Sequence, residues 1–488
     1  MRIVALIAMA VCLSAAAGFV DQGSSASTKR PNVIFILTDD LSWNLVRYMP
    51  HVRQMQKDGV TFQKFFVTNS LCCPSRASIF TGKFPHNTGI YANGGKYGGF
   101  TRFHDTGLEK DTFATRLHNS GYTTALMGKY LNGYTPSLRV DGSEKYVPPG
   151  WDEWDVAGKA YDEFDYGLNE NHHIRSYGHE PEDYLTDVLA QKGVDFVNRA
   201  VTGKKPFFLE IAPFSPHAPY TPAPRHESWF PKIRAPRTPA FNEANVSDKP
   251  SWLRKRTPLR RLQVSSIDQD FRKRVQAVQS VDEMIGDLHE ALAASGQLSN
   301  TYIFFSSDNG LHMGEHRLAP GKMTAYETDI HVPLIATGPG VPHGRTIEQL
   351  TSTVDLFPTF TDLGKAPTPT GVDGHTLVPL LKGQKVTGWR TAVLIEHHGP
   401  DVTAGDPDFP GPFAGNPDSY KALRTSSSTY VEYVDNELEY YNLKKDPYEL
   451  YNSAKRLAPL KVGDLHAQLV VLSSCHGAVS CWTAAGGH

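Results

Sequence analysis

The sequence predicts a doubly wound α/β domain followed by a smaller α+β region at the C-terminus. Three apolar, β-rich runs end in polar residues, as buried parallel strands do when their carboxyl ends carry a ligand site. Helical patterns lie between these runs, and alternating strands and helices are typical of a sheet flanked by helices. We therefore expect a leader at residues 1–26, a main domain at 31–375 and a subdomain built on an antiparallel sheet at 376–488.

Each of the three strand-like runs carries different polar groups at its C-terminal end. The run NVIFILTDD ends in Asp39 and Asp40, and the run YIFFSSDNG ends in Asp308 and Asn309. The run PFFLEIAPFSPHAPY carries His217 just beyond its apolar part. Because ligand sites in open α/β sheets lie outside the carboxyl ends of the strands, we expect these side chains to converge.

Two segments between these runs have the periodicity of amphipathic helices. One extends from Phe271 toward the stop signal Gly296, and the other covers residues 183–200. The Pro- and Arg-rich stretch from Pro222 to Pro258 has no clear period and predicts a long surface excursion. In the C-terminal subdomain, β-prone residues alternate around the turn VDNE, which predicts a hairpin.

Composition and charge narrow the class of protein. The 488 residues are 40% hydrophobic and 20% charged, which is ordinary for a soluble globular protein with a large core. The formal net charge of −2 argues against nucleic acid or an anionic membrane surface as the main partner. Net charge does not exclude a local basic pocket, because it says nothing about how charge is distributed.

The N-terminal residues have the pattern of an export signal. One Arg, an apolar run and a cluster of small residues predict a secretory signal peptide that is cleaved near Ala17. A membrane anchor is the alternative, but the apolar run is borderline for the about 20 residues that a span needs. Cys12 follows Val11 rather than a small residue, which disfavours a lipoprotein. We expect a mature chain without a stable membrane span, secreted or periplasmic, and lysosomal if the source is eukaryotic.

Cleavage would leave four cysteines in the mature chain. Export exposes them to oxidising conditions, in which disulfides form where the geometry permits. Cys475 and Cys481 can close a short loop, so we predict a disulfide between them. Cys72 and Cys73 are neighbours, and adjacent cysteines rarely bridge each other. A metal clamp, a buried apolar pair and a nucleophile all stay open as explanations of that pair.

The acidic ends of two strand-like runs predict a metal site. Asp39, Asp40, Asp308 and Asn309 offer only oxygen ligands, which suit Ca²⁺ or Mg²⁺ better than Zn²⁺. Each pair alone is ordinary turn chemistry. Their positions at the ends of apolar runs favour the metal.

The stretch CCPSR followed by ASIFTGKFPH resembles the signature of the formylglycine-dependent sulfatases, C-x-P-S-R with T-G downstream. The resemblance extends from Asn32 to about Tyr451 and includes DNG, GKMTAYETDIHVPLIATGPG and YYNLKKDPYELYN. LCCPSRASI and GKYLNGY look closest to the branch of N-acetylglucosamine-6-sulfatases and related glycosaminoglycan sulfatases. The resemblance implies the mixed, doubly wound sheet of the alkaline phosphatase superfamily. It also implies hydrolysis of sulfate monoesters, of sulfated sugars or aryl alcohols, to alcohol and inorganic sulfate.

The resemblance further implies a catalytic group made from the chain itself. In this family a formylglycine-generating enzyme oxidises the first cysteine of the pentapeptide to formylglycine (3-oxoalanine), and the matching residue is Cys72. A hydroxyl of the hydrated aldehyde, activated by a bound metal that is usually Ca²⁺, with Mg²⁺ as the alternative, attacks sulfur. The second hydroxyl then expels sulfate from the covalent sulfo-intermediate, an exit that a thiol or a serine lacks. Cys73 takes the variable position and is expected to be a buried bystander.

The same resemblance assigns the other roles. Cationic side chains would surround the reacting group: Arg76 would hold the hydrated formylglycine, and Lys129, His217 and Lys322 would contact the sulfate oxygens. His217 or Lys322 would protonate the leaving alkoxide, and Asp308 would accept a proton from the nucleophile. For each, the alternative is a solvated charge or a structural residue. The implied metal ligands are Asp39, Asp40, modified Cys72, Asp308 and Asn309.

One position departs from the pattern of many arylsulfatases. Leu131 stands where they carry a histidine that helps to release sulfate, a lack that the glycosaminoglycan branch shares. We take His312 as the replacement base and as a substrate-binding residue. His316 is left between a structural and a site role, and His86 is expected to support the structure around Cys72.

Two alternatives belong to other functional classes. A phosphomonoester or phosphonate hydrolase would use the same scaffold, because a fold alone does not fix the substrate. A non-catalytic protein that binds sulfated glycans would leave Cys72 unmodified.

Overall fold

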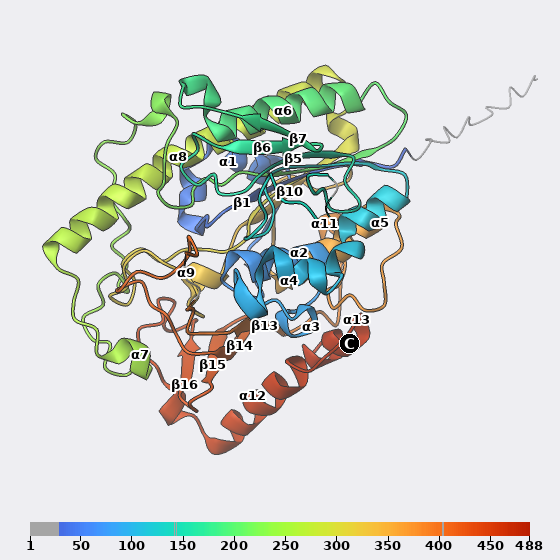
Figure 1. Cartoon of the computed structure of the whole chain (residues 1–488). Helices are drawn as coiled ribbons and strands as arrows, with labels where there is room; N and C mark the ends of the chain where they lie inside the picture. The colour runs from blue at the N-terminus through green and yellow to red at the C-terminus, as the bar shows by residue number, and fades with distance from the viewer. Residues whose placement is uncertain (1–28, 141, 143, 403–404) are drawn as a thin grey trace, which may run out of the picture.

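The computed structural model describes residues 29–140, 142, 144–402 and 405–488. A ten-stranded sheet with helices on both faces forms the larger part of the molecule, and a four-stranded sheet lies beside it (Figure 1). This architecture confirms the predicted α/β domain with a smaller antiparallel region. The predicted signal peptide, including Cys12, lies outside the described residues.

The large sheet is mixed, with a parallel centre. Strands β9, β1, β8, β4 and β5 lie next to one another and run parallel. At one side β10 pairs antiparallel with both β9 and β2, and at the other β6 pairs antiparallel with β5 and β7. In spatial order the strands are β11 (Arg345–Ile347), β2 (Val60–Phe62), β10 (Leu334–Thr337), β9 (Thr301–Ser307), β1 (Asn32–Thr38), β8 (Phe207–Ala212), β4 (Thr123–Lys129), β5 (Glu153–Ala157), β6 (Gly167–Glu170) and β7 (His173–Ser176).

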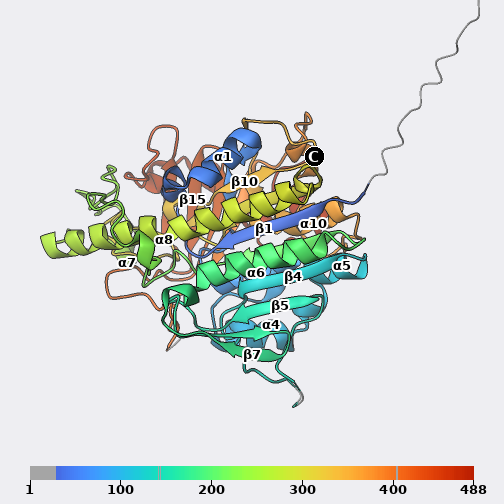
Figure 2. The ribbon, with the colours of Figure 1, turned by 90° about the horizontal axis from the view of Figure 1, so that it is seen from above.

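The central strands are apolar on both faces because helices cover both faces. In β1, Phe35 packs into the core on one side of the sheet, and its neighbours Ile34 and Ile36 pack into the core on the other side. Over the second face, α6 lies beside the C-terminal half of α8 (Figure 2). The first face carries α2 (Cys72–Thr81), α4 (Gly99–Asp105), α5 (Phe113–Asn119) and α10 (Leu356–Gly364), and the second carries α1 (Pro50–Asp58), α6 (Leu185–Ala200) and α8 (Arg261–Ala294).

Both predicted helices are present, but one is longer than expected. Helix α6 matches the prediction closely, whereas α8 begins at Arg261, ten residues before Phe271. The first turns of α8 carry few core-facing apolar residues, so the hydrophobic period does not report them. The predicted surface excursion before α8 holds only the short helices η5 (Pro224–His226) and α7 (Ser251–Arg254).

The C-terminal sheet is antiparallel throughout and includes the predicted hairpin. Its strands are β13 (Ala392–His397), β14 (Tyr420–Thr425), β15 (Ser428–Tyr433) and β16 (Leu438–Asn442). One face packs against the main core, and α12 (Pro459–Leu472) with α13 (Ala478–Ala484) covers the other. The predicted disulfide joins Cys475, just after α12, to Cys481 in α13. The predicted domain boundary at residue 375 falls between α10 and α11 (Val378–Leu381) and stays a prediction.

Within the part of the chain that the structure describes, no helix is both long enough and apolar enough to cross a membrane.

Candidate active site

The site lies at the carboxyl ends of β1, β8 and β9, where the sequence predicts it. Strands β1 and β9 are parallel and in register, with Thr38 opposite Ser307, so the residues that follow them meet at one edge of the sheet. The backbone N–H of Asp40 donates to Oδ1 of Asp308 at 3.1 Å, and Nδ2 of Asn309 donates to Oδ1 of Asp40 at 2.6 Å. Two acidic strand ends are thereby tied into one cluster.

Cys72 lies at the centre of this cluster, and its neighbour does not. Helix α2 begins at Cys72, so the positive end of its dipole faces the carboxylates. The thiol donates to Oδ1 of Asp39 at 3.2 Å, and Nζ of Lys322 donates to the sulfur at 2.8 Å. Burial, followed by the charge of Asp39, raises the pKa of the Cys72 thiol well above its ordinary value. Cys73 packs instead into the apolar core, as expected of a bystander.

Two lysine side chains neutralise the aspartates of β1. Nζ of Lys129 lies 2.5 Å from Oδ2 of Asp39, and Nζ of Lys322 lies 2.6 Å from Oδ1 of Asp40. Burial alone would lower both lysine pKa values, but the neighbouring carboxylates raise them well above the ordinary value. Both ammonium groups are therefore charged and fixed in a buried site.

Arg76 is fully buried and links α2 to the end of β9. Its Nε donates to Oδ2 of Asp308 at 2.8 Å, and Nη1 donates to the carbonyl of Lys129 at 2.9 Å. Burial alone would raise the pKa of Asp308, but the positive charges of Arg76, Lys129 and Lys322 together outweigh burial and lower that pKa to about 2. Nη2 of Arg76 is buried without a partner among the described residues. One donor of this guanidinium is thus available to a further oxygen atom.

His217 meets the cluster through a residue that sequence reasoning missed. Its Nε2 lies 2.6 Å from Oδ1 of Asp408 and 3.6 Å from Oδ2 of Asp40. Oδ1 of Asp408 also lies 2.7 Å from Nζ of Lys322, and its Oδ2 accepts from Nδ2 of Asn93 at 2.7 Å. Asp408 belongs to the irregular connection between β13 and β14, where DPD is the only signal that the sequence offers.

A second missed residue supports the site from α8. Arg274 is fully buried and donates to the backbone carbonyl of Asp40, and to Oγ of Ser42 at 3.3 Å. Asp40 has a φ of 63°, a left-handed conformation that is uncommon outside glycine. The hydrogen bond from Arg274 holds this backbone, and with it the direction of the Asp40 carboxylate.

His312 does not join the cluster directly. Its Nδ1 lies 2.9 Å from Oδ2 of Asp329, and Nε2 donates to the carbonyl of Ala414 at 2.7 Å. Its backbone pairs with Gly321, next to Lys322. Both ring nitrogens are therefore engaged by residues outside the Cys72 cluster. His316 is similarly occupied, with Nδ1 2.6 Å from Glu243.

His86 lies where a supporting residue is expected. Its Nδ1 lies 2.7 Å from Oε2 of Glu396, and Nε2 donates to the carbonyl of Cys475 at 2.9 Å. These contacts tie the turn after α2 to the C-terminal sheet and to the disulfide.

Leu131 lines a cavity of about 180 Å³ beside Lys129, which Asn132 and Tyr161 also line.

The carboxylate oxygens of the cluster around Cys72 suit a hard divalent cation, whereas its sulfur and imidazole nitrogen are ligands of softer metals. Asp39, Asp40, Cys72 and His217 each offer a ligand atom, and these atoms lie within 4.8 Å of one another. Oδ1 of Asn309 is buried without a partner in the described part of the chain. Burial raises the pKa of Asp39, a cost that a divalent cation would offset. The cluster includes His217, which the sequence assigned to the sulfate, whereas Asp308 and Asn309 reach it through Asp40.

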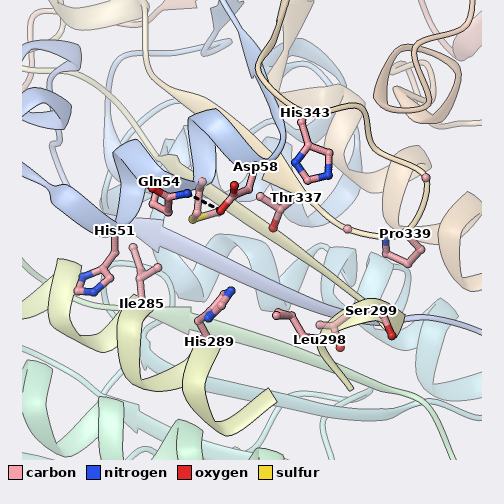
Figure 3. Close-up of a pocket in the computed structure, with 14 residues that line it drawn as sticks. His51, Gln54, Asp58, Ile285, His289, Leu298, Ser299, Thr337, Pro339 and His343 are labelled. Atoms are coloured by element: carbon pink, nitrogen blue, oxygen red, sulfur yellow. Dashed lines mark hydrogen bonds between the residues drawn. The ribbon is translucent and has the colours of Figure 1, made fainter. Parts of the chain in front are cut away.

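A larger cavity of about 570 Å³ lies at the opposite edge of the sheet (Figure 3). It is lined by Thr301, at the start of β9, and by His51, His289 and His343. The seven residues of β9 separate it from Asp308 by about 23 Å. In the described residues the mixed cluster of carboxylates and cations around Cys72 has no counterpart there, and we place the candidate active site at the Cys72 end.

Comparisons with known proteins find similarity over most of the chain. Residues 31–366 match the family profile described as Sulfatase, and residues 314–472 match that of N-sulphoglucosamine sulphohydrolase, C-terminal. The N-acetylglucosamine-6-sulfatase of Homo sapiens is 37% identical over 483 residues, covering 93% of this chain and 86% of that protein.

Two solved structures show the same fold at lower identity. A protein in complex with its substrate D-glucosamine-2-N,6-O-disulfate is 24% identical, with a TM-score of 0.74 over 91% of this chain and 97% of that one. A phosphonate monoester hydrolase from Silicibacter pomeroyi is also 24% identical, with a TM-score of 0.67 over 90% of this chain and 93% of that one.

Proposed function

The chain belongs to the sulfatase family and hydrolyses sulfate esters of sugars, and on that premise we propose that its nucleophile is a formylglycine made from Cys72. The observation that carries this proposal is the position of Cys72, fully buried between the Asp39 carboxylate and the Lys322 ammonium. We propose a sulfated hexosamine of a glycan as the substrate, because the human relative is an N-acetylglucosamine-6-sulfatase.

The cationic side chains would bind and orient the sulfate group. Lys129 and Lys322 approach from two elements, and each already carries a buried positive charge. A sulfate ester held between them would have its non-bridging oxygens neutralised before reaction, in a site that excludes water. The unpaired Nη2 of Arg76 is available to an oxygen on residue 72.

A proton must reach the leaving alkoxide, and His217 is placed to deliver it. Its Nδ1 donates to the carbonyl of Ala218 at 2.7 Å, and its Nε2 donates to Asp408. With both ring nitrogens protonated, the imidazolium would donate from Nε2 to the bridging oxygen as the bond to sulfur breaks. Lys322, which shares Asp408 with His217, is the alternative proton donor.

Asp39, Asp40, Asp308 and Asn309 would hold the metal, and we propose Ca²⁺, with Mg²⁺ as the alternative. When bound, the cation supplies positive charge that acidifies a hydroxyl and polarises the ester. Thermal unfolding in EGTA and after added Ca²⁺ tests this without an activity assay. A midpoint that rises with Ca²⁺ and saturates supports the site, and an unchanged midpoint contradicts it.

The base for sulfate release needs reassignment. The described contacts of His312 are with Asp329, Ala414 and Gly321, and none is with Cys72. We propose that His312 positions the Lys322 segment rather than acting as the base. Leu131 supplies no proton acceptor. Of the several acid–base groups in the cluster, we propose Asp308 or His217 as the base.

Mass spectrometry of the peptide that contains Cys72 tests the nucleophile directly. Conversion to the aldehyde lowers the peptide mass by about 18 Da relative to the thiol. We expect this shift in enzyme coexpressed with a formylglycine-generating enzyme, together with turnover of a 6-sulfated hexosamine. Full activity in a preparation that carries only the thiol form would overturn the proposal.

Phosphonate ester hydrolysis is the second candidate, favoured by the structural likeness to a phosphonate monoester hydrolase. Rates on paired sulfate and phosphonate esters of one alcohol separate the two.

Export also belongs to this proposal: the predicted leader directs it, and the Cys475–Cys481 disulfide supports an oxidising compartment.

A further inference from the structure

A groove of about 680 Å³ lies between the N-terminal end of α8, helix α7 and the connection that carries Asp408. Figure 1 shows α7 and the start of α8 on the same side of the molecule. We call it the basic groove, because its lining includes four cationic side chains and no acidic one. Its charged and larger apolar lining residues are Trp252, Lys255, Arg256, Arg260, Leu262, Arg317 and Phe413.

The cations of the basic groove lack the partners that other surface arginines have. Arg225, Arg237 and Arg254 each form an ion pair with a carboxylate. In the described part of the chain, no ion pair joins any of the four groove cations to a carboxylate.

Backbone hydrogen bonds hold two of the groove cations in place. Arg317 donates to the carbonyls of Glu243, Arg256 and Ala244 at 2.6–2.7 Å. Nη1 of Arg256 donates to the carbonyl of Phe413 at 2.8 Å. These arginines therefore present charge from fixed positions, which reduces the entropy lost on binding a ligand. Beside them, Phe413 and Leu262 are 54% and 84% exposed and offer apolar surface.

The basic groove is connected to the candidate active site through short chain segments. The carbonyl of Phe413 accepts from the backbone N–H of Ala319 at 2.9 Å. Lys322, in contact with Cys72, follows Ala319 by three residues, and Asp408 precedes Phe413 by five. Two short chain segments therefore run from the groove lining to residues of the Cys72 cluster.

We propose that the basic groove binds an anionic stretch of the sulfated glycan, adjoining the sugar whose sulfate is removed. The inference rests on the proposed function, and it identifies the substrate as an oligosaccharide with several anionic groups rather than a single sulfated sugar. Sulfate and carboxylate groups along the chain pair with the guanidinium and ammonium groups. The sugar faces pack on Phe413 and Leu262.

The test uses a charge-neutralised groove and a matched control. Lys255 and Arg260 are exposed and form no ion pair among the described residues, so we expect Lys255→Gln with Arg260→Gln to keep the fold, including α8, of which Arg260 is the N-cap. The control is Lys204→Gln with Lys205→Gln. It removes two exposed charges just before β8, at the end of that strand opposite the candidate active site. Each pair is made in the active enzyme and in the Cys72→Ala full-length chain.

Binding is measured with a heparin hexasaccharide and the Cys72→Ala chains by calorimetry. We expect the groove pair to raise Kd about three- to tenfold, as the loss of two exposed ion pairs implies. The control pair should leave Kd unchanged. The difference should shrink as ionic strength rises, because screening weakens exposed charges. In the active enzyme, KM for the sulfated hexasaccharide should rise more than KM for a 6-sulfated monosaccharide.

Equal Kd values for the groove pair and the control pair would overturn the inference. The inference would also be overturned if the groove pair weakened the binding of polyglutamate or single-stranded nucleic acid as much as that of the hexasaccharide. The groove would then be a general polyanion surface. The proposed function fails separately, if the wild-type enzyme does not turn over the sulfated monosaccharide. Reduced hexasaccharide binding in that case would still support the groove as a glycan site.

Discussion

Two buried groups of charged residues in this molecule have similar compositions and opposite characters. One is the cluster around Cys72. The other, which we call the junction cluster, lies where the main domain meets the C-terminal sheet. It consists of Lys249, Tyr326, Glu327, Arg424, Tyr433, Glu439, Tyr441 and Glu449.

In the junction cluster the carboxylate oxygens have hydrogen-bond donors. Glu439 accepts from Tyr433 at 2.6 Å and from Tyr326 at 3.0 Å. Glu449 accepts from Thr429 at 3.1 Å and from the backbone N–H of Glu327 at 2.9 Å. Such a network specifies how two parts of the fold meet.

The cluster around Cys72 is incomplete by comparison. Nη2 of Arg76 and Oδ1 of Asn309 are buried without partners in the described chain. Cys72, at its centre, is a side chain that the proposed chemistry replaces. Burial of charge alone therefore does not mark an active site. The Cys72 cluster differs from the junction cluster in having buried polar atoms left unpaired beside charges of both signs, available to an ion and a substrate.

The largest expected effect comes from removing the sulfur at the centre of the cluster. Cys72→Ala should lower kcat about 10⁴-fold or more, because the nucleophile is lost. The neighbouring Cys73→Ala should keep kcat within a few-fold, since Cys73 packs in the core. Steady-state kinetics with a sulfated monosaccharide, and thermal unfolding of both variants, distinguish the two. Equal losses of activity in the two variants would contradict the assignment of the nucleophile to Cys72 and of a packing role to Cys73.

Breaking the junction cluster should act on stability instead. Arg424 donates to Glu327 and its guanidinium carbon lies 4.6 Å from the centre of the Phe66 ring. Arg424→Met should lower the free energy of unfolding by about 2 kcal/mol, because the partly buried Glu327 carboxylate loses its charge-assisted hydrogen bond and keeps only its described contact with His331. Denaturant unfolding measures the loss, and kcat per folded molecule should stay within twofold. Adding Glu327→Gln should recover part of the stability, and a variant that loses kcat instead would break the comparison.

Asp408 joins the Cys72 cluster from the irregular connection between β13 and β14. Asp408→Asn keeps the shape but removes the charge that holds Lys322 and His217. We expect kcat/KM to fall on the order of tenfold to 100-fold, as for other residues that orient catalytic groups. Asp418→Asn is the control, because Asp418 lies in the same connection and its side chain forms no described contact with Asp408 or with the Cys72 cluster. Similar losses in both variants would assign the effect to the loop and not to Asp408.

The smallest effect concerns pH. Burial, followed by the charge of Glu327, raises the pKa of Glu449 from 4.5 to about 8. The folded state therefore keeps a proton that the unfolded state releases, so this group destabilises the fold progressively as pH rises from about 4.5 to 8. Glu449→Gln should reduce the loss of stability between pH 5 and pH 8 by on the order of 1 kcal/mol. Thermal unfolding at both pH values measures it, with the exposed Glu290→Gln as the control. Identical pH slopes in wild type and Glu449→Gln would refute the expectation.

The parts of the site that the sequence predicts are those carried by regular strands. Asp39, Asp40 and Asp308 follow buried apolar runs, and parallel pairing in register brings the ends of such runs together. The motif around Cys72 adds the start of α2, and the family resemblance adds Lys129 and Lys322. These residues meet as expected because strand register and helix direction are set locally by the sequence.

The residues that sequence reasoning missed reach the site from irregular or distant segments. Asp408 lies in a connection without hydrophobic period, and Arg274 lies on α8 among residues that read as an ordinary amphipathic helix. His312 illustrates the opposite error. It stands near Lys322 in sequence, but it faces Asp329 and Ala414. Side-chain direction in loops depends on tertiary contacts that a local pattern does not encode.

The burial of Cys72 has a consequence for how the enzyme is made. In the folded chain Cys72, Ser75 and Arg76 are all fully buried, and Arg76 is bound to Asp308. A second enzyme cannot reach these side chains once the fold has closed over them. If Cys72 is oxidised as we propose, the oxidation precedes folding. The yield of active enzyme then depends on the rate of oxidation relative to the rate of folding. Molecules that fold first would be stable, correctly shaped and permanently inactive. The active fraction of any preparation would therefore record the history of its synthesis as well as its sequence.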